Sequence, residues 1–151
     1  MMKKGDLVPD LMLKDQNRND FSFRELVGEK AFVVYFYPKD FTPGCTKEAC
    51  SFRDSYQEFQ DLGAEVIGIS ADTTASHAKF SEKYNLPYIF LSDRNKKARD
   101  AFNVKASLLG LLPGRETFVF GKDGKLLHRF NSMNASRHMP EALDILKKYQ
   151  N

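Results

Sequence analysis

The sequence predicts a single α/β domain in which helices flank a mixed central sheet. The chain has 151 residues, and about 100–200 residues are typical of one domain. Segments with the composition of buried strands alternate with segments that have helical spacing, an order typical of parallel crossovers. An Asp-Gly pair between two late apolar runs indicates a hairpin, which adds antiparallel strands to the sheet.

The first strand and the first helix are predicted from the middle third of the chain. Residues 31–37 form a continuous β-branched and aromatic run, as in a strand buried on both faces, and the run ends at Pro38. Residues 43–61 read as one helix, with Gly63 after it as a stop signal. The apolar positions that recur at helical spacing are Ala49, Phe52, Tyr56 and Phe59.

The next four elements continue the alternation. Residues 65–70 are a second buried strand, and residues 74–84 a helix. Residues 88–91 are a short strand, and residues 95–102 a short helix. We expect three residues of the second helix to point inward: Ala75, Ala78 and Phe80.

The C-terminal part is predicted to contain a hairpin and a closing helix. Strands at 117–120 and 125–130 are joined by the turn 121–124, and residues 139–149 form the last helix. The predicted order is therefore β-α-β-α-β-α-β-β-α, with parallel crossovers followed by an antiparallel edge. This order fits a thioredoxin-like arrangement in one domain over residues 1–151.

The composition excludes several classes of protein. With 42% hydrophobic and 13% aromatic residues, the chain is not disordered. The net charge of +3 and the interspersed charges give no reason to expect nucleic-acid binding. The most apolar run, residues 31–37, is much shorter than the about 20 residues of a membrane span, and no signal peptide is visible. We expect a cytoplasmic protein, or one of the plastid stroma or thylakoid lumen if a transit peptide has been removed.

The segment most informative about chemistry joins the first strand to the first helix. Thr42 is a good N-cap and Pro43 a good first helical residue, so Cys45 is expected at the third helical position. There its sulfur lies near unpaired N–H groups and the positive end of the helix dipole, which stabilise a thiolate. From this position alone, a small buried structural cysteine remains an equally open interpretation.

Two other kinds of site have little support in the sequence. The spacing of Cys45 and Cys50 lacks the second ligand pair that a structural zinc site needs, and the three histidines are scattered. A hydrolase site of Ser70, Asp72 and His77 would lack a Gly-x-Ser-x-Gly elbow. Two cysteines are also too few for a disulfide scaffold.

The same segment resembles the active-site signature of a known family. The pattern Pro38-x-x-x-Thr42-x-x-Cys45 is similar to that of the peroxiredoxins, which are cysteine-dependent peroxidases. A second cysteine at Cys50 resembles the bacterioferritin-comigratory-protein subfamily, also called peroxiredoxin Q. The likeness covers nearly the whole chain; beyond this segment it includes residues 65–72, 91–93 and 112–118.

The resemblance implies a reaction and a role for each residue. Cys45 would be the peroxidatic cysteine that reduces hydrogen peroxide and organic hydroperoxides and becomes a sulfenic acid. Thr42 would hydrogen-bond the thiolate and peroxide, Pro38 would shield the sulfur, and Arg115 would hold the thiolate and the peroxide oxygens. Cys50 would form an intramolecular disulfide with Cys45, which thioredoxin or a similar dithiol would reduce. The implied protein is an antioxidant monomer without metal or other cofactor.

Three residues near this signature have two interpretations each. Arg115 follows a Pro-Gly turn, and without the resemblance a surface cation would be the preferred interpretation. Glu48 orients an arginine or supports the helix N-terminus. Phe41 favours alkyl hydroperoxides from the lip of the pocket or packs locally; we prefer local packing.

The spacing of the two cysteines sets a condition on the disulfide. In an ideal helix, residues five apart have Cα atoms about 8.7 Å apart, whereas a disulfide needs about 4.4–6.8 Å. If Cys50 resolves the sulfenic acid of Cys45, residues 43–52 must therefore be remodelled. A thiol-disulfide oxidoreductase or redox sensor on the same fold would favour Cys-x-x-Cys instead. A chaperone or scaffold with incidental cysteines is the remaining alternative.

Overall fold

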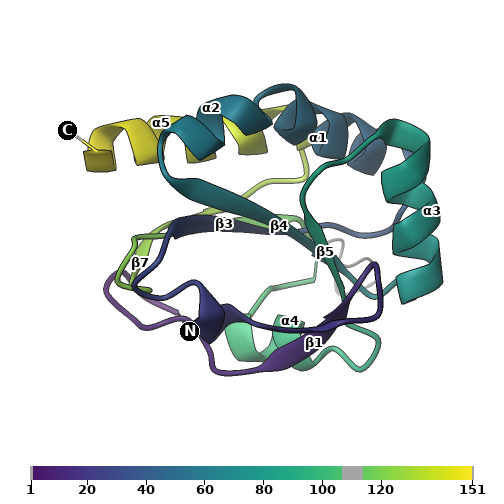
Figure 1. Ribbon diagram of the computed structural model, residues 1–151, viewed down its shortest axis with the longest axis horizontal. Coiled ribbons are helices and arrows are strands. Elements are labelled where there is room, and N and C mark those ends of the chain that lie inside the picture. The colour runs from purple at the N-terminus through teal and green to yellow at the C-terminus, as the bar shows by residue number, and fades with distance from the viewer. Residues whose placement is uncertain (1, 107–113, 151) are drawn as a thin grey trace.

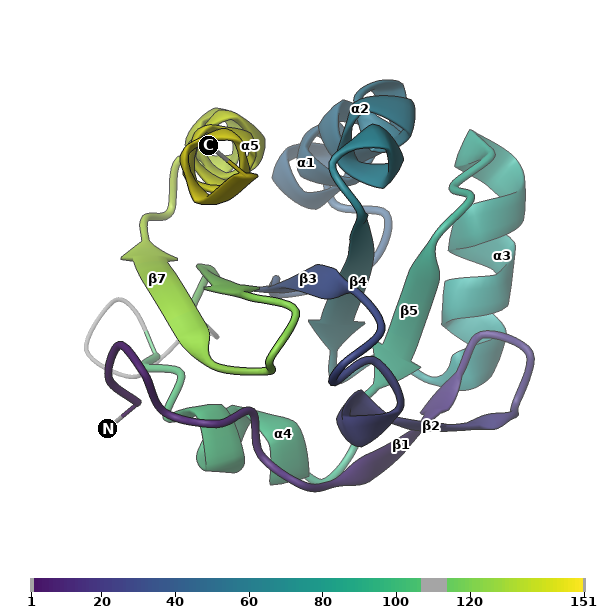
Figure 2. The same ribbon diagram turned by 60° about the vertical axis from the view of Figure 1, so that its left-hand side comes forward.

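The computed structural model describes residues 2–106 and 114–150 and confirms the α/β architecture. One seven-stranded mixed sheet has the order β2-β1-β5-β4-β3-β6-β7, with helices on both faces (Figures 1 and 2). The strands are β1 (Met12–Asp15), β2 (Asp20–Ser22), β3 (Ala31–Phe36), β4 (Ala64–Ser70), β5 (Ile89–Ser92), β6 (Glu116–Phe120) and β7 (Leu126–Asn131). The α-helices are α1 (Pro43–Asp54), α2 (Tyr56–Asp61), α3 (Thr74–Tyr84), α4 (Lys97–Phe102) and α5 (His138–Gln150); the 3-10 helices are η1 (Phe23–Glu25) and η2 (Ala135–Arg137).

The centre of the sheet has the predicted topology. β3, β4 and β5 run parallel, while β6 pairs antiparallel with β3 and with β7. The parallel strands end at the same edge of the sheet, where side chains of several loops meet. The loop after β3 and the segment before β6 both lie at this edge, because Phe36 pairs with Glu116.

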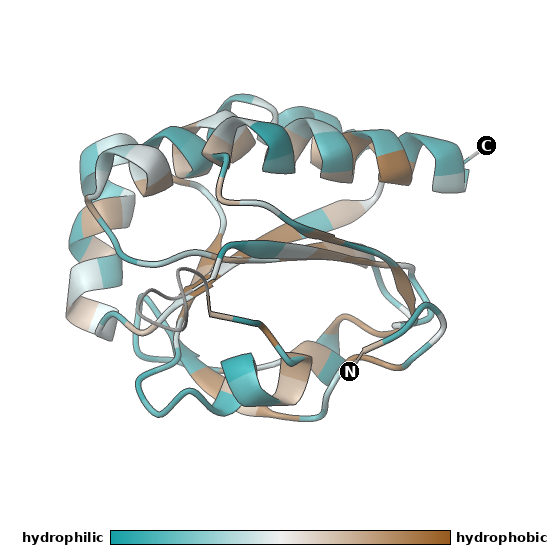
Figure 3. Cartoon of the chain, turned by 180° about the vertical axis from the view of Figure 1, so that it is seen from behind, coloured by the Kyte–Doolittle hydropathy of each residue, from teal (hydrophilic) through white to brown (hydrophobic). Residues whose placement is uncertain are grey.

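Alternate residues of β3 fill two separate hydrophobic cores. Val33 and Tyr35 pack on the face covered by α1, α2, α3 and α5, whereas Phe32 and Val34 pack on the face covered by α4 and the N-terminal segment. All six residues of β3 are buried, so the strand is apolar throughout, as expected for a strand covered on both sides. In Figure 3 the helices show alternating teal and brown bands, as amphipathic helices do.

The predicted helix 43–61 is wrong in one respect, because two helices occupy this range. Ser55, with φ −106° and ψ 7°, leaves the helical conformation between α1 and α2. The chain bends there, while Phe52 and Phe59 on either side keep their rings 5.7 Å apart in the same core. Serine is a common residue at such bends.

The N-terminal hairpin of β1 and β2 was not predicted. β1 pairs antiparallel with β5 and thereby extends the sheet beyond the predicted strands. Each of the two strands buries a single residue, Leu13 in β1 and Phe21 in β2. One apolar residue per strand is too weak a pattern for a strand prediction from sequence.

The other predicted elements agree with the structure to within two residues. Gly63 has a φ of 74° and Asn85 a φ of 52°, so each adopts the left-handed conformation that ends a helix. The predicted inward position of Ala75 is wrong, because Ala75 is exposed and α3 buries His77 and Phe80 instead. Within the ranges 2–106 and 114–150, no helix combines the length and the apolar character that crossing a membrane requires.

Candidate active site

Cys45 lies where β3 passes into α1. Thr42 has the extended conformation of an N-cap, with φ −73° and ψ 150°, and Pro43 is the first helical residue. Cys45 is therefore the third residue of the helix, as predicted; it is free and 1% exposed. Unpaired helix N–H groups and the helix dipole favour a thiolate at this position.

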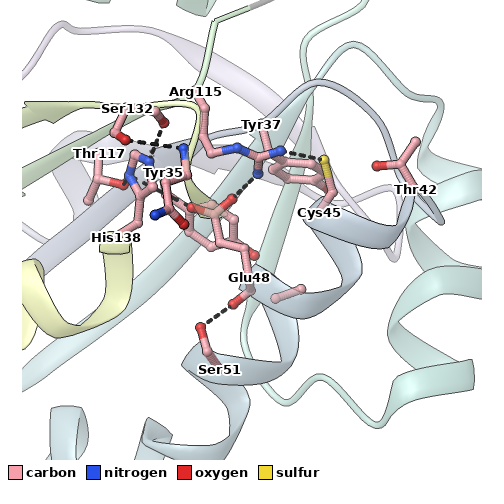
Figure 4. Close-up of polar contacts among 12 residues, drawn as sticks. Tyr35, Tyr37, Thr42, Cys45, Glu48, Ser51, Arg115, Thr117, Ser132 and His138 are labelled. Atoms are coloured by element: carbon pink, nitrogen blue, oxygen red, sulfur yellow. Dashed lines mark hydrogen bonds and ion pairs between the residues drawn. The ribbon is translucent and has the colours of Figure 1, made fainter. Parts of the chain in front are cut away.

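The guanidinium of Arg115 lies between Cys45 and Glu48 (Figure 4). Its Nη2 donates to Cys45 Sγ at 3.4 Å, and its Nη1 donates to Glu48 Oε1 at 2.5 Å. Arg115 is 5% exposed, so its interpretation as a surface cation is wrong. The two bonds fix the plane of the guanidinium and direct one N–H toward the sulfur.

Glu48 is the buried carboxylate that orients Arg115. Burial raises the pKa of Glu48 to about 8, although Arg115 lowers it. Its second oxygen, Oε2, has no hydrogen-bond partner among the described residues, and His138 Nδ1 is 3.8 Å away from it. Of the two interpretations from sequence, the contact with Arg115 supports the first.

His138 closes the site from α5 and was not singled out in the sequence. Its Nε2 is 2.6 Å from the carbonyl oxygen of Ser132, and its Nδ1 is 2.8 Å from Thr117 Oγ1. A carbonyl only accepts, so Nε2 carries the proton and, in the neutral ring, Nδ1 accepts from the Thr117 hydroxyl. Burial, assisted by the charge of Arg115, lowers the pKa of His138 to about 4. The ring is therefore neutral near pH 7 and adds no charge beside Glu48.

The loop between β3 and Cys45 is anchored by Asp40, which sequence reasoning also missed. Asp40 Oδ1 accepts from Tyr37 Oη at 2.6 Å, and Oδ2 is 2.7 Å from His77 Nδ1. His77 Nε2 donates to the carbonyl of Leu91 at 3.0 Å, so one more proton lies between Nδ1 and Asp40. The backbone N–H of Asp40 donates to Asp72 Oδ2 at 2.8 Å. These contacts fix the loop against β4, β5 and α3.

The same contacts contradict the hydrolase interpretation of Ser70, Asp72 and His77. Ser70 Oγ donates to Asp72 at 2.6 Å, but His77 bonds Asp40 and Leu91 instead of the serine. A serine without a histidine base at its hydroxyl is not an activated nucleophile. Asp40, Asp72 and His77 bring possible ligand atoms within 4.8 Å of one another, and these atoms all take part in the hydrogen bonds that hold the loop.

The remaining predicted residues are Thr42, Pro38 and Cys50, and the structure corrects one expectation for Thr42. Thr42 occupies the N-cap position, but its hydroxyl makes no capping bond and donates to the carbonyl of Lys39 at 2.9 Å. Figure 4 shows Thr42 beside Cys45 at the start of α1. Pro38 follows β3 and is half-buried, and Cys50 is a free, half-buried residue farther along α1. Both cysteines therefore lie on one intact helix.

Phe41 packs locally, as preferred from the sequence. Its ring lies edge-on to Phe80 at 5.2 Å and tilted against Tyr84 at 6.5 Å, both on α3. Its φ of 66° is unusual for a residue other than glycine. The ring contacts and the bonds of the preceding Asp40 hold this conformation. Leu112 and Pro113, which belong to the segment resembling peroxiredoxins, lie outside the described residues.

The chain matches known proteins over nearly its full length. The AhpC/TSA family matches residues 4–129. Peroxiredoxin Q, chloroplastic, of Gentiana triflora is 48% identical over 147 residues, which are 97% of this chain and 67% of that protein. The protein of the same name from Arabidopsis thaliana is 49% identical over 148 residues, 97% of this chain and 68% of that protein.

Solved structures show the same fold. Peroxidoxin BcpB of Mycobacterium tuberculosis has a TM-score of 0.89 at 40% identity, with 98% of each chain covered. The bacterioferritin comigratory protein of Xanthomonas campestris, described with alkyl peroxide reduction activity, has a TM-score of 0.89 at 28% identity, covering 100% of this chain and 99% of that one.

Proposed function

The chain belongs to the AhpC/TSA family as a peroxiredoxin of the Q type, with a thioredoxin-like fold and thiol peroxidase activity, and on this premise we propose that Cys45 is its peroxidatic nucleophile. One observation carries the assignment to Cys45. The buried Arg115 guanidinium, oriented by Glu48, donates to its sulfur at 3.4 Å in the first turn of α1. A cation and a helix N-terminus together favour the thiolate, which is the reactive form.

The first step transfers one oxygen from peroxide to sulfur. The Cys45 thiolate attacks the terminal oxygen of the peroxide, so that an S–O bond forms while the O–O bond breaks. Sulfur is oxidised to sulfenic acid, and the leaving alkoxide or hydroxide takes a proton to become alcohol or water. Arg115 would stabilise the charge that develops on the leaving oxygen. Thr42 and Pro38, from the loop beside the sulfur, would bind the peroxide and exclude water.

The second step converts the sulfenic acid into a disulfide. The Cys50 thiolate attacks the Cys45 sulfenic acid, so an S–S bond forms and hydroxide leaves, to be protonated to water. Cys45 and Cys50 lie on the same helix, and the helical spacing of about 8.7 Å exceeds disulfide geometry. The first turns of α1 must therefore unwind. An external dithiol of the thioredoxin type then reduces the disulfide by thiol exchange.

We also propose the setting in which this cycle runs. The protein acts as a monomer in a reducing compartment, the cytoplasm or, as for its chloroplastic relatives, the plastid. No contact among the described residues favours a redox-sensor role over the peroxidase. The substrate range includes hydrogen peroxide and organic hydroperoxides, as the family resemblance implies, and the ring contacts of Phe41 with α3 give no reason to narrow it.

The function is tested by peroxide consumption coupled to thioredoxin oxidation. Cys45→Ser should reduce consumption to the uncatalysed level, because it removes the attacking sulfur. Cys50→Ser should consume one equivalent of peroxide and stop, leaving a sulfenic acid that mass spectrometry detects as one added oxygen. Wild-type protein given the same dose should lose two hydrogens as a disulfide forms.

Two outcomes would contradict the proposal. Sustained peroxide turnover by Cys45→Ser would show that another group reduces the peroxide. Turnover of Cys50→Ser with thioredoxin at the wild-type rate would show that Cys50 does not resolve the sulfenic acid. Both variants should be compared at matched concentration, with circular dichroism confirming that each is folded.

A further inference from the structure

Arg99 is a buried arginine that lies on α4, on the opposite side of the sheet from α1. Its Nη2 donates to the carbonyl of Tyr37 at 3.1 Å, and its Nη1 donates to the carbonyl of Gly114 at 3.3 Å. The two carbonyls belong to segments that are 77 residues apart in the chain, so one side chain connects them. No motif or spacing in the sequence pointed to this residue.

The two tethered carbonyls directly precede two residues of the proposed site. Tyr37 directly follows β3 and precedes Pro38, and Gly114 precedes Arg115, the residue just before β6. Fixing a carbonyl fixes the peptide plane that leads into the next residue. Arg99 therefore determines the relative placement of the residue proposed to shield the sulfur and the residue that donates to it.

The surroundings of Arg99 leave its side chain little freedom. Asp93 accepts the backbone N–H groups of Ala98 and Arg99 at 2.8 and 3.0 Å and so fixes the start of α4. The guanidinium carbon lies 5.7 Å from the ring centre of Phe36. At Gly114 the chain is confined as well, because a Cβ atom there would lie 1.8 Å from the carbonyl oxygen of Lys105.

Burying the charge of Arg99 costs free energy, and no ion pair with a described residue offsets that cost. Among residues 2–106 and 114–150, no carboxylate lies within ion-pair distance of the guanidinium, and Asp93 uses its oxygens on backbone N–H groups. Burial lowers the pKa of Arg99, while Asp93 and Cys45 act against that lowering. A buried charge needs compensating contacts, and the described ones are the two carbonyls and the face of Phe36.

We propose that Arg99 is a positioning residue of the peroxidase, which holds the Pro38 segment and the Arg115 segment at the separation that peroxide binding requires. The inference rests on the roles proposed above for these two residues. Only a planar fork with two separate N–H groups can hold both carbonyls at once. The ammonium group of a lysine is a compact donor on a flexible stem and cannot reproduce that geometry.

The proposal is tested by two rates measured on the same variants. Arg99→Met and Arg99→Lys should each lower the second-order rate with hydrogen peroxide by about tenfold to a hundredfold, as misplaced catalytic groups do. Alkylation of Cys45 by iodoacetamide, in a Cys50→Ser background, needs the thiolate but no peroxide site. Its rate should change by no more than about twofold, since the helix N-terminus and the nearby charge of Arg115, still held by Glu48, continue to favour the thiolate.

A matched control for Arg99→Lys is Arg129→Lys. Arg129 also bridges two carbonyls, those of Met2 and Asn103 at 3.0 and 3.4 Å, and it pairs with the buried Glu116, for which a lysine keeps the partner charge. This variant should lower the melting temperature, as the Arg99 variants do, while the ratio of peroxide rate to alkylation rate stays that of wild type. Assays run well below each melting temperature separate placement from unfolding.

Each other outcome overturns the proposal. A wild-type peroxide rate in Arg99→Lys would show that the positive charge alone suffices. An equal loss of the peroxide rate and the alkylation rate in Arg99→Met would show that Arg99 acts through its charge on the thiolate and not through placement. An unchanged ratio in both variants would make Arg99 a structural residue only. Arg115→Lys, measured in parallel, separates this failure from that of the proposed function: if it too leaves the peroxide rate unchanged, the role of Arg115 fails first.

Discussion

At the scale of single residues, the site is organised around one guanidinium shared by two groups. Arg115 donates one N–H to the Cys45 sulfur and another to the Glu48 carboxylate, and both partners are buried with it. The carboxylate fixes the direction of the fork, but its charge also offsets part of the positive charge available to the sulfur. The raised pKa of Glu48, about 8, reduces that offset at neutral pH.

Arg115→Lys tests whether peroxide reduction needs the planar guanidinium of Arg115 or only its positive charge. We expect the second-order rate with hydrogen peroxide to fall by about a hundredfold, since loss of one aligned donor to a developing anion has an effect of this size. The fold should persist, because β6 pairs through its backbone. Competition with a second peroxidase measures the rate, since the chain has no tryptophan whose fluorescence could report it. A rate within about twofold of wild type would contradict the assignment of Arg115.

The sequence predicted the residues that carry a local pattern and missed those that depend on tertiary contacts. Thr42, Pro43 and Cys45 could be placed at a helix start because capping and helical count are local properties. The burial of Arg115 beside Cys45 followed only from the family resemblance. Asp40 and Arg99 act through partners far along the chain, and no spacing rule connects such partners.

At the scale of elements, α1 is anchored to its neighbours just beyond Cys50. Phe52 stacks on Tyr35 with ring centres 4.6 Å apart, and Arg53 Nη1 donates to the carbonyl of Tyr84 at 2.7 Å. The preceding loop is held through Asp40. The stretch between these two anchors contains both cysteines, so it is the part of α1 that can open while the rest of the domain stays folded.

Oxidation should therefore loosen residues 43–52 and little else. One equivalent of peroxide should make the amides of this segment exchange faster with deuterium in wild type, because the disulfide cannot form in an intact helix. Cys50→Ser given the same peroxide is the control and should keep its protection. A Cys45–Cys50 disulfide with unchanged exchange in this segment would refute the unwinding, and so would equal loosening of α4, residues 97–102.

The elements themselves were largely predictable from the sequence, and the exceptions have a physical cause. Buried strands such as β4 and capped helices such as α3 carry strong local patterns, and their observed bounds lie within one residue of the predicted ones. β1 and β2 bury one residue each and depend on β5 for pairing. The break at Ser55 has no proline or glycine to mark it.

At the scale of the whole molecule, two buried groups couple stability to pH in opposite directions. Folded Glu48 holds its proton up to about pH 8, whereas its ordinary pKa is 4.5, so the folded state binds more protons between these values. Stability then falls as pH rises. His138 stays neutral down to about pH 4 when folded, against an ordinary pKa of 6.5, so its contribution is lost as pH falls through that window.

Below pH 6.5 the effects of Glu48 and His138 on stability oppose each other. Between pH 6.5 and 8, of these two groups, only Glu48 changes stability with pH. The unfolding free energy should fall there by up to about 1.4 kcal/mol per pH unit, and Glu48→Gln should remove this slope. Urea titrations at several pH values measure the slope of the unfolding free energy. The proteins with and without Glu48→Gln both carry Cys45→Ser, so that the thiol does not contribute. His138→Asn should keep the slope. Equal slopes with and without Glu48 would contradict the prediction.

The hydroxyl of Tyr88 bears on the lifetime of the sulfenic acid proposed for Cys45. It donates to the carbonyl of Ala49 at 2.7 Å and lies 2.9 Å from the hydroxyl of Tyr35, with both rings buried. A helix carbonyl that loses its own N–H partner inside a protein is destabilised by about 1–3 kcal/mol. If opening of α1 breaks the helix bond of this carbonyl while the Tyr88 bond stays in place, Ala49 keeps a donor, which would lower the barrier to opening and shorten the life of the sulfenic acid. A tyrosine remote from the sulfur would thus help set the dose of oxidant that the enzyme survives.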